Sequence, residues 1–188
     1  MKKSIFMWIV LTIALCLCFS CEEPYKMPYT PGVTVDEESF NEHKTLWENS
    51  GIKNYSYTYT VKLHGYPYNH IIDVTVKEGK VYEYILREYK YKKESELTVE
   101  DKLLFESELE SIDSLLIENI YNYINQTIKS NFESYKKNKE NYYANFIFEF
   151  SDSAPFIVFH ERTSLFMGEL LNGNGSTIEI KIENFKAN

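Results

Sequence analysis

The sequence predicts an α+β domain, an antiparallel sheet of about six strands with helices on one face. Six segments alternate apolar and polar residues with period two, which is typical of half-buried strands. Two further segments have apolar residues three and four positions apart, one before the first three strands and one before the last three, which favours helices. The expected order is therefore helix, three strands, helix, three strands. Because each strand has a single apolar side, the helices are expected to cover only one face of the sheet.

The N-terminal segment is typical of an export signal. Two lysines precede seventeen uncharged, mostly apolar residues, Ser4 to Ser20. A positive start, an apolar run and a small residue at the cleavage point predict a signal peptide over residues 1–20. The alternative is an uncleaved membrane helix, for which seventeen residues are at the short end of the roughly 17–25 required.

Cys21 follows the small residue Ser20 and resembles the lipidated cysteine of bacterial lipoproteins. Such signals usually have leucine three places before the cleavage point, where this chain has Cys18. We expect Cys21 to carry the lipid, including palmitate, that anchors the protein in the cell envelope. Several acyl chains together hold a protein stably on a membrane, whereas one chain is marginal.

Residues 21–33 are expected to be an extended spacer, because three prolines fall among them and proline blocks helices and central strands. A single α+β domain over 34–188 follows. Thr34–Glu37 predicts a capping box, and Phe40 and Trp47 predict the apolar side of a short helix. Gly51 supplies the stop for this helix.

The remaining elements follow from the same patterns. Strands are expected at 54–63, 70–77, 80–91, 142–150, 156–161 and 177–183. Glu78–Gly79 predicts a tight hairpin turn. Thr98–Asp101 predicts the cap of a short helix. A long helix is expected from Ser111, with an apolar stripe at Ile112, Leu116, Ile120, Tyr123, Ile124, Ile128 and Phe132.

Composition limits the partners. The chain has 28 acidic and 20 basic residues, and removal of Lys2 and Lys3 with the signal takes the net charge from −8 to −10. A strongly negative protein is not expected to bind nucleic acid. All three cysteines lie at or before Cys21, so the predicted domain has no disulfide and no cysteine nucleophile.

Several short stretches together resemble a known protein family. They are Trp47, NYSYTYTV (54–61), VTVKEGKV (74–81), SIDSLL (111–116) and FEFSDSAPFIV (148–158). Their order and spacing resemble a family of small bacterial lipoproteins of unknown function (DUF6174-like) over about residues 45–186. A cysteine pair of many relatives is replaced here by HGYPYN (64–69). The resemblance implies a location and an architecture, and no chemistry.

The tyrosines are the one suggestive set of side chains. Tyr82 and Tyr84 lie on the third predicted strand, and Tyr66 and Tyr68 in the turn between the first two strands. Exposed together, these four would form a binding surface for a protein or a glycan, since tyrosine combines a large ring with a polar tip. The alternative is that they fill the core.

No catalytic, metal or cofactor site is predicted. Motifs such as GxSxG, HExxH and the P-loop are absent. His64, His70 and Asp73 suggest a metal or acid–base set, but Asp73 is expected on the opposite side of its strand from His70. The acidic residues Glu106, Glu108, Glu110 and Asp113 are expected to form a solvated face before the long helix.

These observations favour a non-enzymatic binding or structural module, tethered to the membrane through Cys21. Two alternatives stay open. One is an envelope hydrolase that uses a histidine and a carboxylate, such as His160 and Glu161. The other is a protein inhibitor that presents a loop at 64–69 or 162–176.

Overall fold

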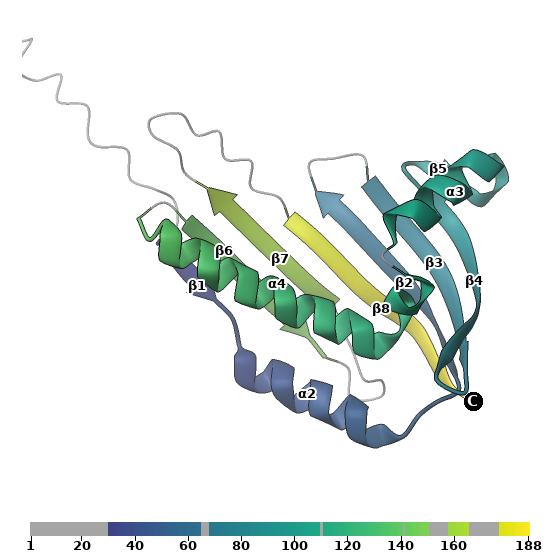
Figure 1. Cartoon of the computed structure of the whole chain (residues 1–188), viewed down its shortest axis with the longest axis horizontal. Helices are drawn as coiled ribbons and strands as arrows, with labels where there is room; N and C mark the ends of the chain where they lie inside the picture. The colour runs from purple at the N-terminus through teal and green to yellow at the C-terminus, as the bar shows by residue number, and fades with distance from the viewer. Residues whose placement is uncertain (1–29, 65–67, 110, 141, 151–157, 166–176) are drawn as a thin grey trace, which may run out of the picture. The chain divides into compact units, whose positions relative to one another are not determined.

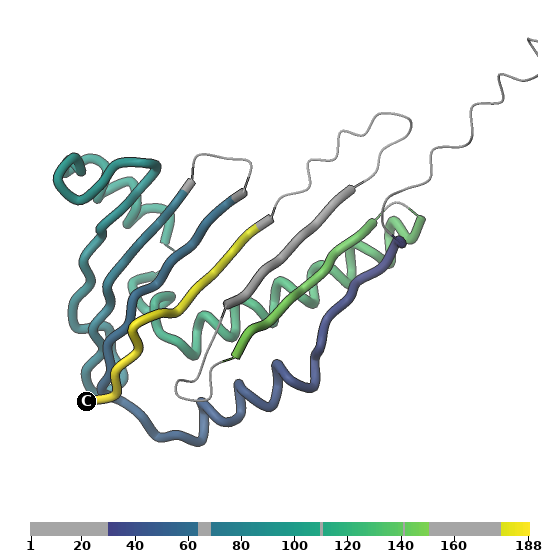
Figure 2. Tube along the Cα trace, turned by 180° about the vertical axis from the view of Figure 1, so that it is seen from behind, coloured from purple at the N-terminus to yellow at the C-terminus, as the bar shows by residue number. Residues whose placement is uncertain are grey.

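The structure, a computed structural model, describes residues 30–64, 68–109, 111–140, 142–150, 158–165 and 177–188, without the side chains of 64, 68, 158–165 and 177. Pro31–Asn188 forms one compact unit. The unit is α+β, as predicted, with helices packed on a mainly antiparallel sheet (Figures 1 and 2).

The described elements are as follows. The strands are β1 (Gly32–Thr34), β2 (Tyr55–His64), β3 (Tyr68–Lys77), β4 (Lys80–Tyr89), β5 (Lys92–Lys93), β6 (Tyr142–Glu149), β7 (Val158–Leu165) and β8 (Thr177–Ala187). The helices are α2 (Glu37–Ser50), α3 (Val99–Glu108) and α4 (Ile117–Lys137), with short 3-10 helices η1 (Glu94–Glu96) and η2 (Ile112–Leu115).

The sheet has the order β1-β6-β7-β8-β2-β3-β4-β5. β1 runs parallel to β6, and the other neighbouring strands are antiparallel. The C-terminal strand β8 therefore lies in the middle, where it joins β2–β5 to β6 and β7. Figure 2 shows the strands from the side opposite α4.

The prediction of six antiparallel strands is corrected by two additional short strands within the described residues. β1 pairs Gly32 with Tyr143 at one edge, inside the segment expected to be a spacer. β5 pairs Lys92 and Lys93 with the end of β4 at the other edge. Segments of three and two residues carry no periodic pattern, and their partners alone make them strands.

Helix α2 forms largely as predicted, with a different cap. Asp36, not Thr34, is the N-cap, and its side chain accepts a hydrogen bond from the Ser39 amide at 3.0 Å. Thr34 is instead the last residue of β1. The helix buries Phe40 and Trp47, and Gly51 ends it in the left-handed conformation at φ 66°.

Helix α4 begins later than predicted, because the chain first forms the 3-10 turn η2, capped by Ser111. Ile120, Ile124 and Ile128 of the predicted apolar stripe are buried, but within the helix the stripe is corrected at one position. Tyr121 is fully buried, whereas Tyr123, expected in the apolar stripe, is 49% exposed. The start of α4 is held against β2 by two hydrogen bonds. The Ile117 amide donates to the Tyr55 hydroxyl at 3.4 Å, and the Tyr57 hydroxyl donates to the Leu115 carbonyl.

The core lies between the sheet and the helices. It is built from the large buried side chains Phe40, Trp47, Tyr55, Tyr57, Ile72, Val74, Leu86, Tyr89, Phe105, Ile117, Tyr121, Ile124, Phe146 and Ile180. Trp47 makes an edge contact with the Tyr55 ring, at 5.2 Å between centroids. Buried residues of α2, α3 and α4 thus belong to a single cluster with strand residues of both halves of the sheet.

Two bulges interrupt the pairing of β3 with β4. Tyr82 is the additional residue at the first, between the pairs Val76–Val81 and Thr75–Glu83. Arg87 is the additional residue at the second, between Leu86 and Glu88. Because a bulge shifts the alternation of side chains, both Leu86 and Tyr89 are buried although they are three residues apart.

Candidate functional site

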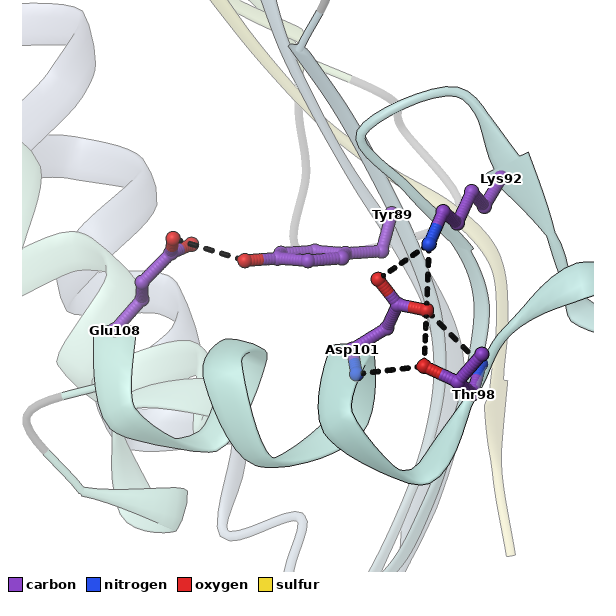
Figure 3. Close-up of polar contacts among 5 residues, drawn as sticks. All are labelled: Tyr89, Lys92, Thr98, Asp101 and Glu108. Carbon is purple, nitrogen blue, oxygen red and sulfur yellow. Dashed lines mark hydrogen bonds and ion pairs between the residues drawn. The ribbon is translucent and has the colours of Figure 1, made fainter.

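Helix α3 lies against the end of β4, and its capping box forms as predicted. The Thr98 hydroxyl accepts from the Asp101 amide at 3.2 Å, and Asp101 accepts from the Thr98 amide at 2.9 Å and from the Thr98 hydroxyl at 2.6 Å. Lys92 of β5 donates to both oxygens of Asp101 at 2.9 Å (Figure 3). These hydrogen bonds, with that of the Thr98 hydroxyl first, lower the pKa of Asp101 to about 2.

The other end of α3 is held by Glu108. Its Oε1 accepts from the Tyr89 hydroxyl at 2.9 Å (Figure 3) and from Lys90 Nζ at 2.9 Å. Its Oε2 lies 3.9 Å from His70 Nε2. The carboxylate therefore brings together a tyrosine, a lysine and a histidine from β3, β4 and the turn that follows β4.

His70 is enclosed by aromatic rings. It stacks on Tyr89 at 5.1 Å between centroids and meets the Phe105 ring edge-on at 5.6 Å, and its side chain is 16% exposed. Burial lowers the pKa of His70, while Glu108 opposes this shift and Lys90 adds to it. A lowered pKa favours the neutral imidazole at pH 7.

The turn between β4 and β5 is strained. Lys90 and Tyr91 have φ values of 49° and 69°, in the left-handed region that side chains other than glycine rarely adopt. This backbone places the Lys90 ammonium beside Glu108, while Tyr91 is exposed.

A shallow groove of about 200 Å³ opens between β4 and α3. Its lining residues are Tyr84, Ile85, Leu86, Glu94, Lys102 and Phe105. The Tyr84 hydroxyl donates to the Glu106 carboxylate, and burial, followed by this hydrogen bond, raises the pKa of Tyr84 to about 12. The lining of the groove thus combines apolar residues with a lysine and a glutamate.

The structure separates the predicted tyrosine set. Tyr82 is 64% exposed at its bulge, and Lys77 Nζ lies 3.4 Å from the centroid of its ring. Tyr84 is placed opposite the buried Val74 and packs against Phe105 on the side of the sheet that carries the helices. The side chains of Tyr66 and Tyr68, and Cys21, lie outside the described residues.

Among the side chains that it describes, the structure also does not bring together the histidines and carboxylates that the sequence suggested as a metal or acid–base site. Asp73 accepts from Thr58 at 3.0 Å and is paired with Arg87, away from His70. The side chains of His64, His160 and Glu161 lie outside the described residues. Within the described part of the chain, no three His, Cys, Asp or Glu residues gather as metal ligands.

Glu106, Glu108 and Asp113 are exposed, as predicted, while Glu110 lies outside the described residues. Two of them, Glu106 and Glu108, also have partners that the sequence did not predict. Both accept hydrogen bonds from tyrosines of β4, 22 and 19 residues earlier in the chain. No local pattern marks these pairs, because they depend on how α3 folds back over β4. The one available signal was the wealth of tyrosine in 82–91 close to a dense acidic segment.

Chemically, Glu108 with Tyr89, Lys90 and His70 is suited to hold α3 and to exchange protons. The imidazole is covered by two rings, whereas the groove beside it is open.

Among the described residues, no helix has both the length and the apolar character needed to cross a membrane.

Comparison with known proteins gives one family. A model described as a family of unknown function (DUF6174) matches residues 39–138. The match runs from the first turn of α2 through the end of α4, so it includes the groove and the residues around Glu108. No curated protein and no solved structure matches the chain.

Proposed function

The chain belongs to the family of unknown function DUF6174. From the apolar N-terminal stretch that ends at Cys21, we propose that it is a lipid-anchored lipoprotein of the bacterial cell envelope whose domain is a non-enzymatic binding or structural module. The membrane is one partner, through the lipid at Cys21. A protein or a glycan is the second partner, held by the folded domain.

The tether is supported by the order of residues in the sequence. Cys21 follows an uncharged stretch, and the compact unit begins ten residues later, at Pro31. At about 3.3–3.6 Å per extended residue, ten residues reach roughly 35 Å. A spacer of this length is long enough for a lipid-anchored domain to meet a partner in the surrounding solvent.

The binding role rests on one observation: the groove is accessible from solvent, whereas the side chain of His70 is covered. The groove between β4 and α3 opens to solvent, and its lining combines aromatic and aliphatic residues with a lysine and a glutamate. His70, the described histidine nearest to a carboxylate, is instead packed between Tyr89 and Phe105. A general base must reach its substrate, so this arrangement supports binding over hydrolysis.

The tether is tested by Cys21→Ala in the native envelope, with Cys18→Ala as the matched control. The wild-type protein and Cys18→Ala are expected to incorporate radiolabelled palmitate and to sediment with membranes. Cys21→Ala is expected to lose the label and become soluble. Retention of Cys21→Ala in membranes would instead favour the uncleaved helix.

The hydrolase alternative was suggested for His160 and Glu161, whose side chains lie outside the described residues. Among the described side chains, it is favoured by the 3.9 Å approach of His70 to Glu108. It is tested by diethyl pyrocarbonate modification, read residue by residue by mass spectrometry. We expect His70 to react much more slowly in the native protein than in the urea-unfolded protein. Equal rates would mean that His70 is accessible and would reopen the enzymatic reading.

A further inference from the structure

Strand β4 presents most of its outer edge without a strand partner. It spans ten residues, yet β5 pairs only with Glu88 and Tyr89. Over Lys80–Arg87, no other strand lies on that side in the part of the chain that the structure describes. An unpaired edge carries free N–H and C=O groups and is a template for another extended chain.

The middle of this edge is regular. Between the bulges at Tyr82 and Arg87, residues Glu83–Leu86 pair one-to-one with Ile72–Thr75 of β3. Exposed edges are commonly blunted by lysine, proline or a bulge. Here the bulges lie at the two ends of the run, and its centre is Ile85, an apolar residue that is 40% exposed.

The groove adjoins the same residues. Tyr84, Ile85 and Leu86 of the regular run line it on the β4 side, Lys102 and Phe105 line it on the α3 side, and Glu94 completes the lining. Its volume of about 200 Å³ is below the roughly 300–1,000 Å³ typical of small-molecule and cofactor sites. A groove of this size suits one large side chain.

We propose that the edge of β4 at Glu83–Leu86 binds an extended peptide segment of a partner protein by strand addition, with one apolar side chain of the peptide in the groove beside α3. Main-chain hydrogen bonds to the edge would supply affinity, and the groove would supply specificity at one position. Since alternate residues of a strand point to opposite sides, the neighbours of that apolar residue stay in solvent.

This inference deepens the proposed binding function and depends on it, because it chooses a polypeptide over a glycan as the partner. A glycan lacks the alternating N–H and C=O groups that an unpaired strand edge requires. The opposite edge of the sheet offers a comparison. Ile147 of β6 lies beyond the last residue paired with β1 and is 49% exposed, but the described groove does not extend to it.

The test is a selection of random linear peptides on the purified full chain, in parallel with a glycan array. We expect the selected peptides to share one apolar residue between polar neighbours. N-methylation of their backbone amides should weaken binding about tenfold at alternate positions and little at the positions between, since only every second amide faces the edge.

Two variants locate the site. Ile85→Lys is expected to weaken binding of the selected peptides at least tenfold, whereas Ile147→Lys is expected to leave it unchanged. Bound peptide should also slow amide hydrogen exchange within Glu83–Leu86 of the wild-type protein, a readout that does not depend on the folding of any variant.

The inference is overturned if no peptide is selected, if N-methylation has no effect at any position, or if Ile147→Lys weakens binding as much as Ile85→Lys. Binding of glycans without peptides would overturn strand addition and leave the binding function standing. Binding of neither class would count against both.

Discussion

The Tyr89 hydroxyl donates to Glu108 Oε1 at 2.9 Å, and this bond joins the last residue of β4 to the last residue of α3. At the opposite end of the helix, Asp101 is held by Lys92 of β5. Phe105 is buried between these two points. Helix α3 is therefore fastened to the sheet by polar contacts at both ends and by one ring at its centre.

Replacing the carboxylate of Glu108 should loosen α3. Glu108→Gln loses the ion pair with Lys90 but keeps an oxygen that accepts from Tyr89. Because the side chain is 37% exposed, we expect a loss of only about 0.5–1 kcal/mol in the free energy of unfolding. In the Glu108→Gln variant, amide hydrogen exchange should show faster opening of α3 than of α4. The control Glu133→Gln removes an exposed pair on α4, and an equal effect on α3 from this control would contradict the assignment.

Asp101 should make stability depend on pH in the acid range. Its pKa falls from the ordinary 3.8 to about 2 on folding. A carboxyl group with a lowered pKa stabilises the fold at pH values above 3.8, and this contribution is lost as the pH falls towards 2. We expect Asp101→Asn to be less stable than the wild type at pH 6 and to converge with it near pH 2. Parallel stability curves from urea unfolding would refute this role.

His70 should make the fold less stable as the pH falls, whereas a histidine that gains an anionic partner on folding makes it more stable. Burial lowers its pKa from 6.5 in the folded state, so the unfolded chain binds the proton more tightly. Stability is therefore expected to fall as the pH drops through 6.5 and to level off below the folded-state pKa. His70→Phe retains ring contacts with Tyr89 and Phe105 and should reduce this dependence between pH 7 and pH 5. An unchanged slope would mean that His70 does not titrate on unfolding.

The strained turn after β4 offers a stabilising substitution. Tyr91 is exposed at φ 69°, where glycine carries no steric penalty. Tyr91→Gly is expected to raise the free energy of unfolding by about 0.5–1 kcal/mol, after subtraction of the greater entropy that glycine gives the unfolded chain. Tyr82→Gly, at an exposed strand position, should lower it. A loss of stability in Tyr91→Gly would show that the Tyr91 side chain contributes more than its backbone costs.

Local patterns predicted the elements that depend on local interactions. The alternation of Tyr55 to Leu63, the Glu78–Gly79 turn and the cap at Thr98 all appear in the structure. The turn and the cap are determined by neighbours within a few residues, and the strand follows from a long local alternation that pairing with β3 and β8 then completes. The burial of Trp47 also followed from its place on a short amphipathic helix.

Features that depend on distant partners were not predictable in this way. The bulge at Tyr82 shifts the alternation of β4 and separates Tyr82 from Tyr84, because it arises from pairing with β3. On α4, Tyr121 is buried rather than Tyr123, because the contacts of the helix with the rest of the fold decide which flank of its apolar stripe is covered. Likewise, Glu108 gained its role only through the contact of α3 with β4.

The parallel pairing of β1 has a mechanical consequence. β1 is the first strand of the compact unit, and its residues Gly32–Thr34 pair with Tyr143–Asn145 of β6. A pull on the chain ahead of Gly32, directed along β1, loads the rungs of this ladder in shear and all at once. The ladder is only three residues long, and the next element, α2, is anchored in the core by Phe40 and Trp47. We expect β1 to detach first under such a pull, which would lengthen the proposed tether while the rest of the domain stays folded.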